Sequence, residues 1–231
     1  SNDNDDNNNG ILGNKKPTIK KKYCIVKPCR GVASDGVHLC SNISELQKAF
    51  QKIKGSSIFG SVGSTKNNNK HDAVLVQEFA VGTEYAIDIV SKNGHHKVAA
   101  LWRYDKRPVN GAPFVYHATE LVDANTKIGR AICRYTIRAL DAFNIQWGIS
   151  HNEVIVLDDD DDDDNIVLVE VNCRQHATDF APLTSACIGY NALDMLLAAY
   201  LGDDDHLLPQ ETKDARLIWD DLPDLPPTRS Y

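Results

Sequence analysis

Several features that define common protein classes are missing from this sequence of 231 residues. No apolar run reaches the roughly 18 residues that a membrane-spanning helix requires, and the polar N-terminus lacks the basic and apolar regions of a signal peptide. The basic residues form no concentrated stripe, so the charge pattern typical of nucleic-acid binding is absent. We therefore expect a soluble, cytoplasmic protein that binds neither a membrane nor a nucleic acid.

The six cysteines are scattered along the chain, and no two of them form a CxxC pair. This spacing argues against a structural zinc site and against a disulfide framework. Cys173 is predicted to be a small core residue.

The chain can nevertheless build a core, since 42% of its residues are hydrophobic. The net charge of -7 comes largely from seven consecutive aspartates at 158–164 and from an Asn/Asp-rich N-terminus. We interpret the aspartate run as a solvated loop, because like charges repel one another. A weakly Ca²⁺-binding loop is the alternative.

Composition divides the chain into three segments. Residues 1–22 are predicted to be disordered and of low complexity, residues 23–201 to form one ordered domain, and residues 202–231 to be an irregular tail. Within the domain we expect a small subdomain at 23–76 and a large one at 77–201, with loop insertions at 55–73 and 158–165.

Apolar and β-branched runs predict strands, and helical spacing of apolar residues predicts helices. Strands are expected at 23–27, 37–40, 73–91 with a break near Gly82, 96–104, 151–157 and 166–172. Helices are expected at 44–54, where Ser44 and Gln47 form a capping-box signature, at 124–143 and at 188–201. Residues 105–114 contain two prolines and an Asn-Gly pair, which predict a turn or loop. Without regular βαβ repeats, the predicted fold class is α+β.

Polar residues follow an apolar run in the segment NIVLVEVNCRQ at 165–175. Glu170, Asn172 and Arg174 occupy alternate positions, and alternate side chains of a strand share one face. If Leu157 pairs with Ile166 in an antiparallel hairpin, the same register sets Glu153 opposite Glu170 and His151 opposite Asn172.

Two opposed carboxylates repel one another, and a divalent cation would remove that cost. Oxygen ligands from Glu153, Glu170 and Asn172 suit Mg²⁺. The alternative is that both acids point to solvent on an exposed face of the sheet. His151 stays without a role at this stage.

Two further segments have a pattern that suits a nucleotide. In YCIVKPCRGVASDGV, Lys27 ends an apolar strand and precedes a loop whose backbone N–H groups could surround phosphate oxygens. In VLVQEFAVGTEYAIDI, Glu78 and Glu84 flank a break where free backbone groups could bind an adenine edge and a carboxylate could bind ribose. Each pattern alone is also typical of ordinary strands and turns.

In this order, VKPCRGVASDGV, VQEFAVGTEY and HNEVIVL with VLVEVNCR resemble the motifs of ATP-grasp ligases. The segment EYAIDIVSKNGHHKVAALWRYDKRPVNGAPFVYHATEL is similar to the carboxylate-amine ligases of that superfamily, which join amino acids into dipeptides or similar amides. The resemblance implies a fold of two α+β subdomains that grip ATP. It also implies an N-terminal domain that is missing here, so the chain is expected to be a fragment or one segment of a larger ligase.

The resemblance assigns a role to each matching residue. ATP would be bound by Lys27, Ser34, Asp35, Gly36, Gln77, Glu78, Phe79, Ala80 and Glu84. Mg²⁺, with Mn²⁺ as a substitute, would be bound by Glu153, Glu170 and Asn172. Arg174 would stabilise the acyl-phosphate formed when a substrate carboxylate attacks the γ-phosphate. Trp102, Arg103 and Tyr104 would face the acceptor side of the site, or would simply pack in their strand.

The predicted function is therefore an ATP- and Mg²⁺-dependent ligase whose carboxylate and amine substrates are small molecules, expected to be amino acids. The alternative is a catalytically inactive ATP-binding module of a larger protein or assembly. The sequence does not determine the oligomeric state, and a homodimer is one of the states that it allows.

Overall fold

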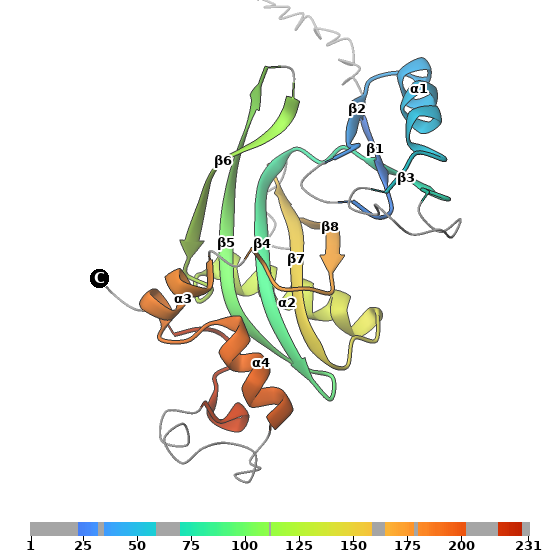
Figure 1. Ribbon diagram of the computed structural model, residues 1–231. Coiled ribbons are helices and arrows are strands. Elements are labelled where there is room, and N and C mark those ends of the chain that lie inside the picture. Colours follow the sequence, from blue (N-terminus) through green and yellow to red (C-terminus); the bar gives the residue numbers. More distant parts are fainter. Residues whose placement is uncertain are drawn as a thin grey trace, which may run out of the picture. The chain divides into compact units, whose positions relative to one another are not determined.

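The computed structural model describes residues 23–31, 35–58, 70–110, 112–158, 165–177, 180–201 and 217–227 (Figure 1). The chain divides into two compact units, Ser1–Phe79 and Ala80–Tyr231. The predicted disordered segment 1–22 and the predicted phosphate-binding Ser34 lie outside the described residues. Within the described ranges, no helix is both long enough and apolar enough to cross a membrane.

The first unit is a three-stranded antiparallel sheet covered by one helix. Its strands β1 (Cys24–Pro28), β2 (His38–Cys40) and β3 (Val74–Glu78) have the order β2-β1-β3. Helix α1 (Ile43–Ile53) packs on one face, where Val26 and Cys40 of the sheet meet Ala49 and Ile53 of the helix.

Helix α1 begins one residue earlier than predicted, and its cap is different. The side chain of Asn42 accepts a hydrogen bond from the Glu45 backbone N–H at 3.0 Å. In return, the Glu45 carboxylate accepts the backbone N–H of Ser41 at 2.7 Å. The predicted cap by Ser44 and Gln47 is therefore wrong, because Asn42 caps as well as serine does and has an acid three residues later.

The second unit contains a five-stranded antiparallel sheet between helices (Figure 1). The strand order is β6-β5-β4-β7-β8. The bounds are β4 (Gly82–Lys92), β5 (His95–Val109), β6 (Ala112–Val122), β7 (Gly148–Leu157) and β8 (Ile166–Asn172), with helices α2 (Lys127–Ala142), α3 (Phe180–Ile188) and α4 (Ala192–Leu201).

Alternation along β4 explains why both faces of this sheet are covered. Ile87 and Ile89 pack with Ile132 and Leu140 of α2, whereas Ala86 and Val90 belong to the core that α4 completes. Side chains of successive strand residues point to opposite faces. The polar residue Asp88 therefore lies on the same face as Ala86 and Val90, and it is buried there.

The segment 105–114 is mostly strand, so its prediction as a turn or loop is wrong. Strand β5 continues to Val109, β6 begins at Ala112, and Asn110 is in a turn with a φ of 50°. The ladder between β4 and β5 ends at Arg103, so beyond that point β5 pairs only with β6. Pro108 is tolerated there because a proline can lie where one neighbouring strand is absent.

The predicted helix at 188–201 begins later, as α4 at Ala192, and a helix that was not predicted, α3, precedes it and ends at Ile188. Gly189 ends α3 with a φ of 103°, a conformation that favours glycine. The Asn191 side chain then accepts the backbone N–H groups of Leu193 at 2.8 Å and Asp194 at 3.2 Å. A C-terminal glycine and a new N-cap thus break the apolar run.

Part of the predicted tail packs into the second unit. Residues 217–227 include a short 3₁₀ helix, η3 (Trp219–Asp221), and Trp219 and Leu222 are buried in the core with α4. The buried Lys97 ammonium donates to the backbone carbonyls of Trp219 and Leu222. This segment is therefore held to β5 by a buried charge as well as by apolar contact.

Candidate functional site

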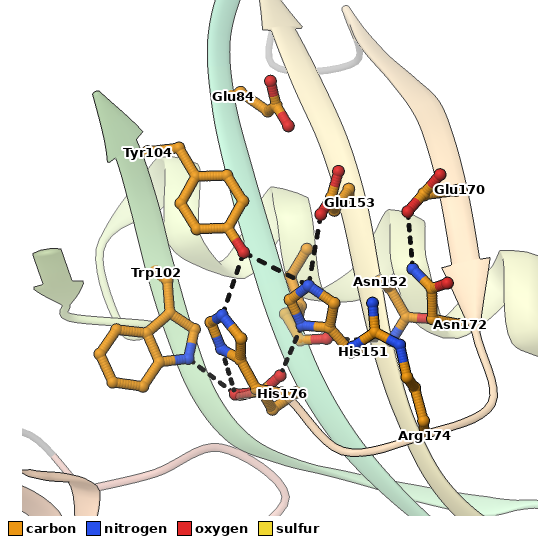
Figure 2. Close-up of polar contacts among 12 residues, drawn as sticks. Glu84, Trp102, Tyr104, His151, Asn152, Glu153, Glu170, Asn172, Arg174 and His176 are labelled. Atoms are coloured by element: carbon orange, nitrogen blue, oxygen red, sulfur yellow. Dashed lines mark hydrogen bonds and ion pairs between the residues drawn. The ribbon is translucent and has the colours of Figure 1, made fainter. Parts of the chain in front are cut away.

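Four neighbouring strands of the second unit place polar side chains on one face of the sheet (Figure 2). These side chains are Glu84 and Asp88 of β4, Tyr104 and Lys106 of β5, His151 and Glu153 of β7, and Glu170 and Asn172 of β8. Alternate positions share a face, and the ladders bring the strands into register.

The predicted register of the metal-binding hairpin is correct at its polar end. His151 lies opposite Asn172 and Glu153 opposite Glu170, and the Asn172 amide donates to the Glu170 carboxylate at 2.8 Å. Towards the aspartate loop the register shifts by one between Glu153 and Val154, so Ile166 pairs with Val156. The predicted pair of Leu157 with Ile166 is therefore wrong, because a β-bulge inserts one extra residue.

A second pair of carboxyl groups joins this set. Glu84 and Glu153 lie close enough for each carboxyl group to affect the pKa of the other, and the Lys106 ammonium donates to Glu84 at 2.5 Å. Burial raises the pKa of Glu84 to about 7 against the opposing effect of Lys106. Burial also acts to raise the pKa of Glu153, but bonds from His151 and the charge of Lys106 hold it below its ordinary value. Of these two carboxyl groups, Glu84 therefore takes up a proton more readily, and Glu153 is the one that stays ionised.

A buried network is centred on the Asp88 carboxylate. It accepts hydrogen bonds from Trp102 Nε1 at 2.7 Å, from His151 Nδ1 at 2.9 Å and from His176 Nδ1 at 3.3 Å. Burial acts to raise the pKa of Asp88, but the bonds from the two histidines outweigh it and lower the pKa. Asp88 is therefore an ionised acceptor inside the core.

The Tyr104 hydroxyl lies between the remaining nitrogens of the two histidines. It is 3.3 Å from His151 Nε2 and 3.1 Å from His176 Nε2, and His151 Nε2 is 3.4 Å from Glu153 Oε1. Burial lowers the pKa of His151, but bonds to Asp88 and Glu153 raise it to about 9. Burial raises the pKa of Tyr104.

These contacts define where the protons lie. His151 is an imidazolium that donates to Asp88 and Glu153. His176 lies between the same two groups, with Nδ1 3.3 Å from Asp88 Oδ2 and Nε2 3.1 Å from the Tyr104 hydroxyl. Every ring nitrogen of the pair then has a partner, and a positive charge lies beside the ionised Glu153.

The same three residues could also be considered as metal ligands, since Asp88, His151 and His176 each offer an atom within 4.8 Å of the others. The two imidazoles, however, are stacked with centroids 4.2 Å apart and planes only 29° apart. A histidine binds metal along its in-plane lone pair, and two nearly parallel rings do not direct those lone pairs to one point. The hydrogen-bonded arrangement therefore accounts better for this cluster.

The predicted nucleotide-binding residues divide between the units. Lys27 on β1 and Gln77 on β3 lie on one face of the first sheet, since Ile25 is opposite Gln77 and Lys27 opposite Leu75.

Asp35 and Gly36 form the turn before β2, and the φ of 71° at Gly36 favours glycine. Glu78 ends β3, and the ring of Phe79 makes an edge contact with Tyr23. Ala80 and Glu84 belong to the second unit.

The segment that follows β8 is organised differently from the strand before it. Arg174 is exposed, and its guanidinium donates to the Gln175 carbonyl at 3.0 Å. Cys173 is also exposed, so its prediction as a core residue is wrong. The strand ends at Asn172, and a turn bond from Arg174 N–H to the Asn172 carbonyl replaces the ladder.

Sequence reasoning missed three members of the polar face. Asp88 is four residues after Glu84, so the alternation along β4 was its available signal. Lys106 was assigned to a loop, and His176 lies beyond the end of β8 in the sequence. Of the residues expected on the acceptor side, Trp102 and Tyr104 are buried in the network, whereas Arg103 is exposed and paired with Glu120.

Comparison with known proteins identifies the family of this chain. The model of the ATP-grasp domain matches residues 20–182. The chain therefore belongs to the ATP-grasp domain family.

Individual relatives match parts of longer chains. Dapdiamide A synthase of Enterobacter agglomerans is 26% identical over 177 residues, which are 77% of this chain and 39% of that protein. The L-amino acid ligase of Bacillus licheniformis has a TM-score of 0.56 at 20% identity, over 76% of this chain and 38% of that one. For D-alanine–D-alanine ligase of Bacillus anthracis the TM-score is 0.53 at 16% identity, over 78% and 54%. The chain thus spans about two fifths of the curated relative it matches, and the two solved structures share its fold.

Proposed function

We propose that this chain is the ATP-grasp part of a ligase that joins a carboxylate to an amine at the expense of ATP. The observation that carries the proposal is the polar face itself, where Glu153, Glu170 and Asn172 lie on two paired strands beside a buried imidazolium. Family membership supports the use of ATP. The activities that name dapdiamide A synthase and the L-amino acid ligase support amino acids or similar molecules as substrates.

The donor set fits Mg²⁺. Glu153 is opposite Glu170 on the paired strand, so the two carboxylates and the neighbouring Asn172 amide offer oxygen ligands. Glu153, Glu170 and Asn172 would hold the ion, and Mn²⁺ could replace it because both favour oxygen ligands. When bound, the ion supplies positive charge that offsets the charge of the phosphate groups.

We assign nucleotide contacts to both units. Lys27 and the loop that includes Ser34, Asp35 and Gly36 would contact phosphates, because an ammonium and backbone N–H groups suit those oxygens. The adenine would be bound along Gln77, Glu78, Phe79 and Ala80. Glu84, held by Lys106, would accept the ribose hydroxyls.

The proposed reaction has two steps. An oxygen of the substrate carboxylate attacks the γ-phosphorus of ATP, ADP leaves, and an acyl-phosphate forms. The amine then attacks the acyl carbon, phosphate leaves with the bonding electron pair, and the amine loses a proton. We propose that Arg174 and the His151 imidazolium stabilise the negative charge of the acyl-phosphate.

The test supplies the chain with ATP, Mg²⁺ and a mixture of amino acids. We expect ADP and phosphate in equal amounts, with an amide product detected by mass spectrometry, and a lower yield of all three at limiting Mg²⁺ when Glu170 is changed to Gln. If ATP binds while neither this chain nor a longer form of the protein releases phosphate, the ligase proposal fails and an inactive ATP-binding module is the better description.

A further inference from the structure

Two cysteines face each other at the start of the first unit. Cys24 of β1 is the direct antiparallel partner of Cys40 of β2. Directly opposed residues of an antiparallel pair have Cα atoms about 4.5 to 5.5 Å apart. A disulfide needs Cα atoms roughly 4.4 to 6.8 Å apart. The backbone therefore already holds this pair at bonding separation.

The side chains also point the same way. Cys40 is buried in the core beneath α1, and Cys24 packs against the same cluster. The nearby Cys24 thiol contributes to the raised pKa of the Cys40 thiol, the Cys40 thiol donates to the His38 carbonyl at 3.9 Å, and both cysteines are free. A disulfide would therefore join two thiols that the strand register already sets opposite one another.

The two thiols differ in access, which gives an order of reaction. Cys24 is half-buried, whereas Cys40 is only 2% exposed. Burial raises the pKa of the Cys40 thiol, which makes it the poorer first nucleophile. An oxidant should therefore meet Cys24 first, and Cys40 should resolve the product.

We propose that Cys24 and Cys40 form a reversible dithiol–disulfide pair that is oxidised by a hydroperoxide. The Cys24 thiolate attacks one peroxide oxygen to give a sulfenic acid and releases the other oxygen as hydroxide or alkoxide, which takes up a proton. The Cys40 sulfur then attacks the Cys24 sulfur, an S–S bond forms, and water leaves. Two thiols are oxidised and one peroxide is reduced, and an added dithiol reverses the change.

The disulfide would tie β1 to β2, the two strands joined through residues 29–37. On β1, Cys24 is two residues before Val26 and three residues before Lys27. The proposal concerns the thiol pair alone and does not depend on nucleotide binding.

The experiment is a peptide map of the full chain after graded hydrogen peroxide and alkylation of the remaining thiols. Trypsin leaves the Lys27 to Pro28 bond intact, so Cys24 and Cys29 share the peptide 23–30, while Cys40 lies in 31–48. The map is therefore run on the wild type and on Cys29→Ser, which removes the ambiguity. Cys24→Ser and Cys40→Ser each remove one of the two thiols that the proposed disulfide requires.

We expect peptides 23–30 and 31–48 to be joined in the wild type and in Cys29→Ser, and released by dithiothreitol. The link should be lost in Cys24→Ser and in Cys40→Ser, and oxidation should raise the melting temperature of the wild type by several degrees. If Cys24 and Cys40 are both still alkylated at a peroxide dose that oxidises the exposed Cys173, the proposal is overturned. Loss of the link in Cys29→Ser would overturn it as well, and neither result requires that Cys24→Ser or Cys40→Ser folds.

Discussion

His151 and Asp88, 63 residues apart in the sequence, form a buried ion pair with 2.9 Å between Nδ1 and Oδ1. The same carboxylate also accepts from Trp102 and His176. One acid therefore orients three side chains around the proposed reaction centre.

Replacing Asp88 by Ala should destabilise the protein strongly. The change leaves the His151 charge buried without its partner, which typically costs about 3–5 kcal/mol. Chemical denaturation would measure the loss. Asp105→Ala is the control, because Asp105 pairs with Arg107 at an exposed site, and it should unfold at nearly the wild-type denaturant concentration. Equal stability of the two variants would contradict the central role of Asp88.

The same carboxylate should make stability depend on acid. The pKa of Asp88 in the folded protein is below its ordinary value of 3.8, because bonds from the histidines outweigh burial. A lowered folded pKa means that this contribution is complete above pH 3.8 and is lost as the pH falls through the folded value. Melting temperatures measured downwards from pH 6 should therefore fall more steeply for wild type than for Asp88→Asn. Parallel curves would rule out this source of acid sensitivity.

Changing Glu170 to Gln should raise the Mg²⁺ requirement. The variant keeps the shape of the side chain but removes one of the opposed negative charges, so we expect at least about a tenfold rise in the Mg²⁺ concentration for half-maximal phosphate release. Glu120→Gln is the control, since Glu120 is exposed on β6 and paired with Arg103. An unchanged titration for Glu170→Gln would refute the metal assignment.

Arg174→Ala should lower turnover while largely sparing ATP affinity. If the guanidinium acts on the acyl-phosphate, its loss should cost roughly 10²- to 10³-fold in kcat, as for other groups that stabilise developing charge. Arg103→Ala removes another exposed guanidinium, paired with Glu120, and should leave kcat unchanged. Near-normal phosphate release by Arg174→Ala would show that the role assigned to Arg174 is wrong.

Gly82→Ala should loosen the junction of β4 with β7. An added Cβ would come within 2.0 Å of the Val156 backbone oxygen, so the strands must separate, at a cost of about 1–3 kcal/mol. Thermal unfolding would detect the change. Val81→Ala is the neighbouring control, because Val81 is 61% exposed, and a melting temperature for Gly82→Ala equal to that of the control would contradict the contact.

The sequence predicted those parts of the site that depend on local periodicity. Glu153, Glu170 and Asn172 were found together because a two-residue period and one antiparallel register place them on one face, and the bulge lies on the far side of Glu153. No local sequence pattern indicates that bulge, so the predicted pairing of Leu157 with Ile166 nearer the loop was wrong. The roles assigned to these residues stay predictions.

The rest of the site depends on contacts between distant segments. Asp88 meets His176 across 88 residues, and neither residue type nor spacing indicates such a pair. Local composition even misled at 105–114, where prolines and an Asn-Gly pair suggested a loop. There the deciding factor was the end of the ladder with β4 at Arg103, which only the assembled sheet reveals.

The buried Lys97 ammonium has a consequence for where this protein can be cut. A shortened form ending at Leu201, the predicted domain boundary, would lack the Trp219 and Leu222 carbonyls that accept from Lys97. The Lys97 ammonium would then be buried without those acceptors. The apolar core residues that pack against the Trp219 ring would also lose that contact. The folded second unit therefore includes the two backbone carbonyls of Trp219 and Leu222. Any shortened form designed for study should extend at least through Pro226, whose carbonyl accepts from Asn125 at 2.8 Å.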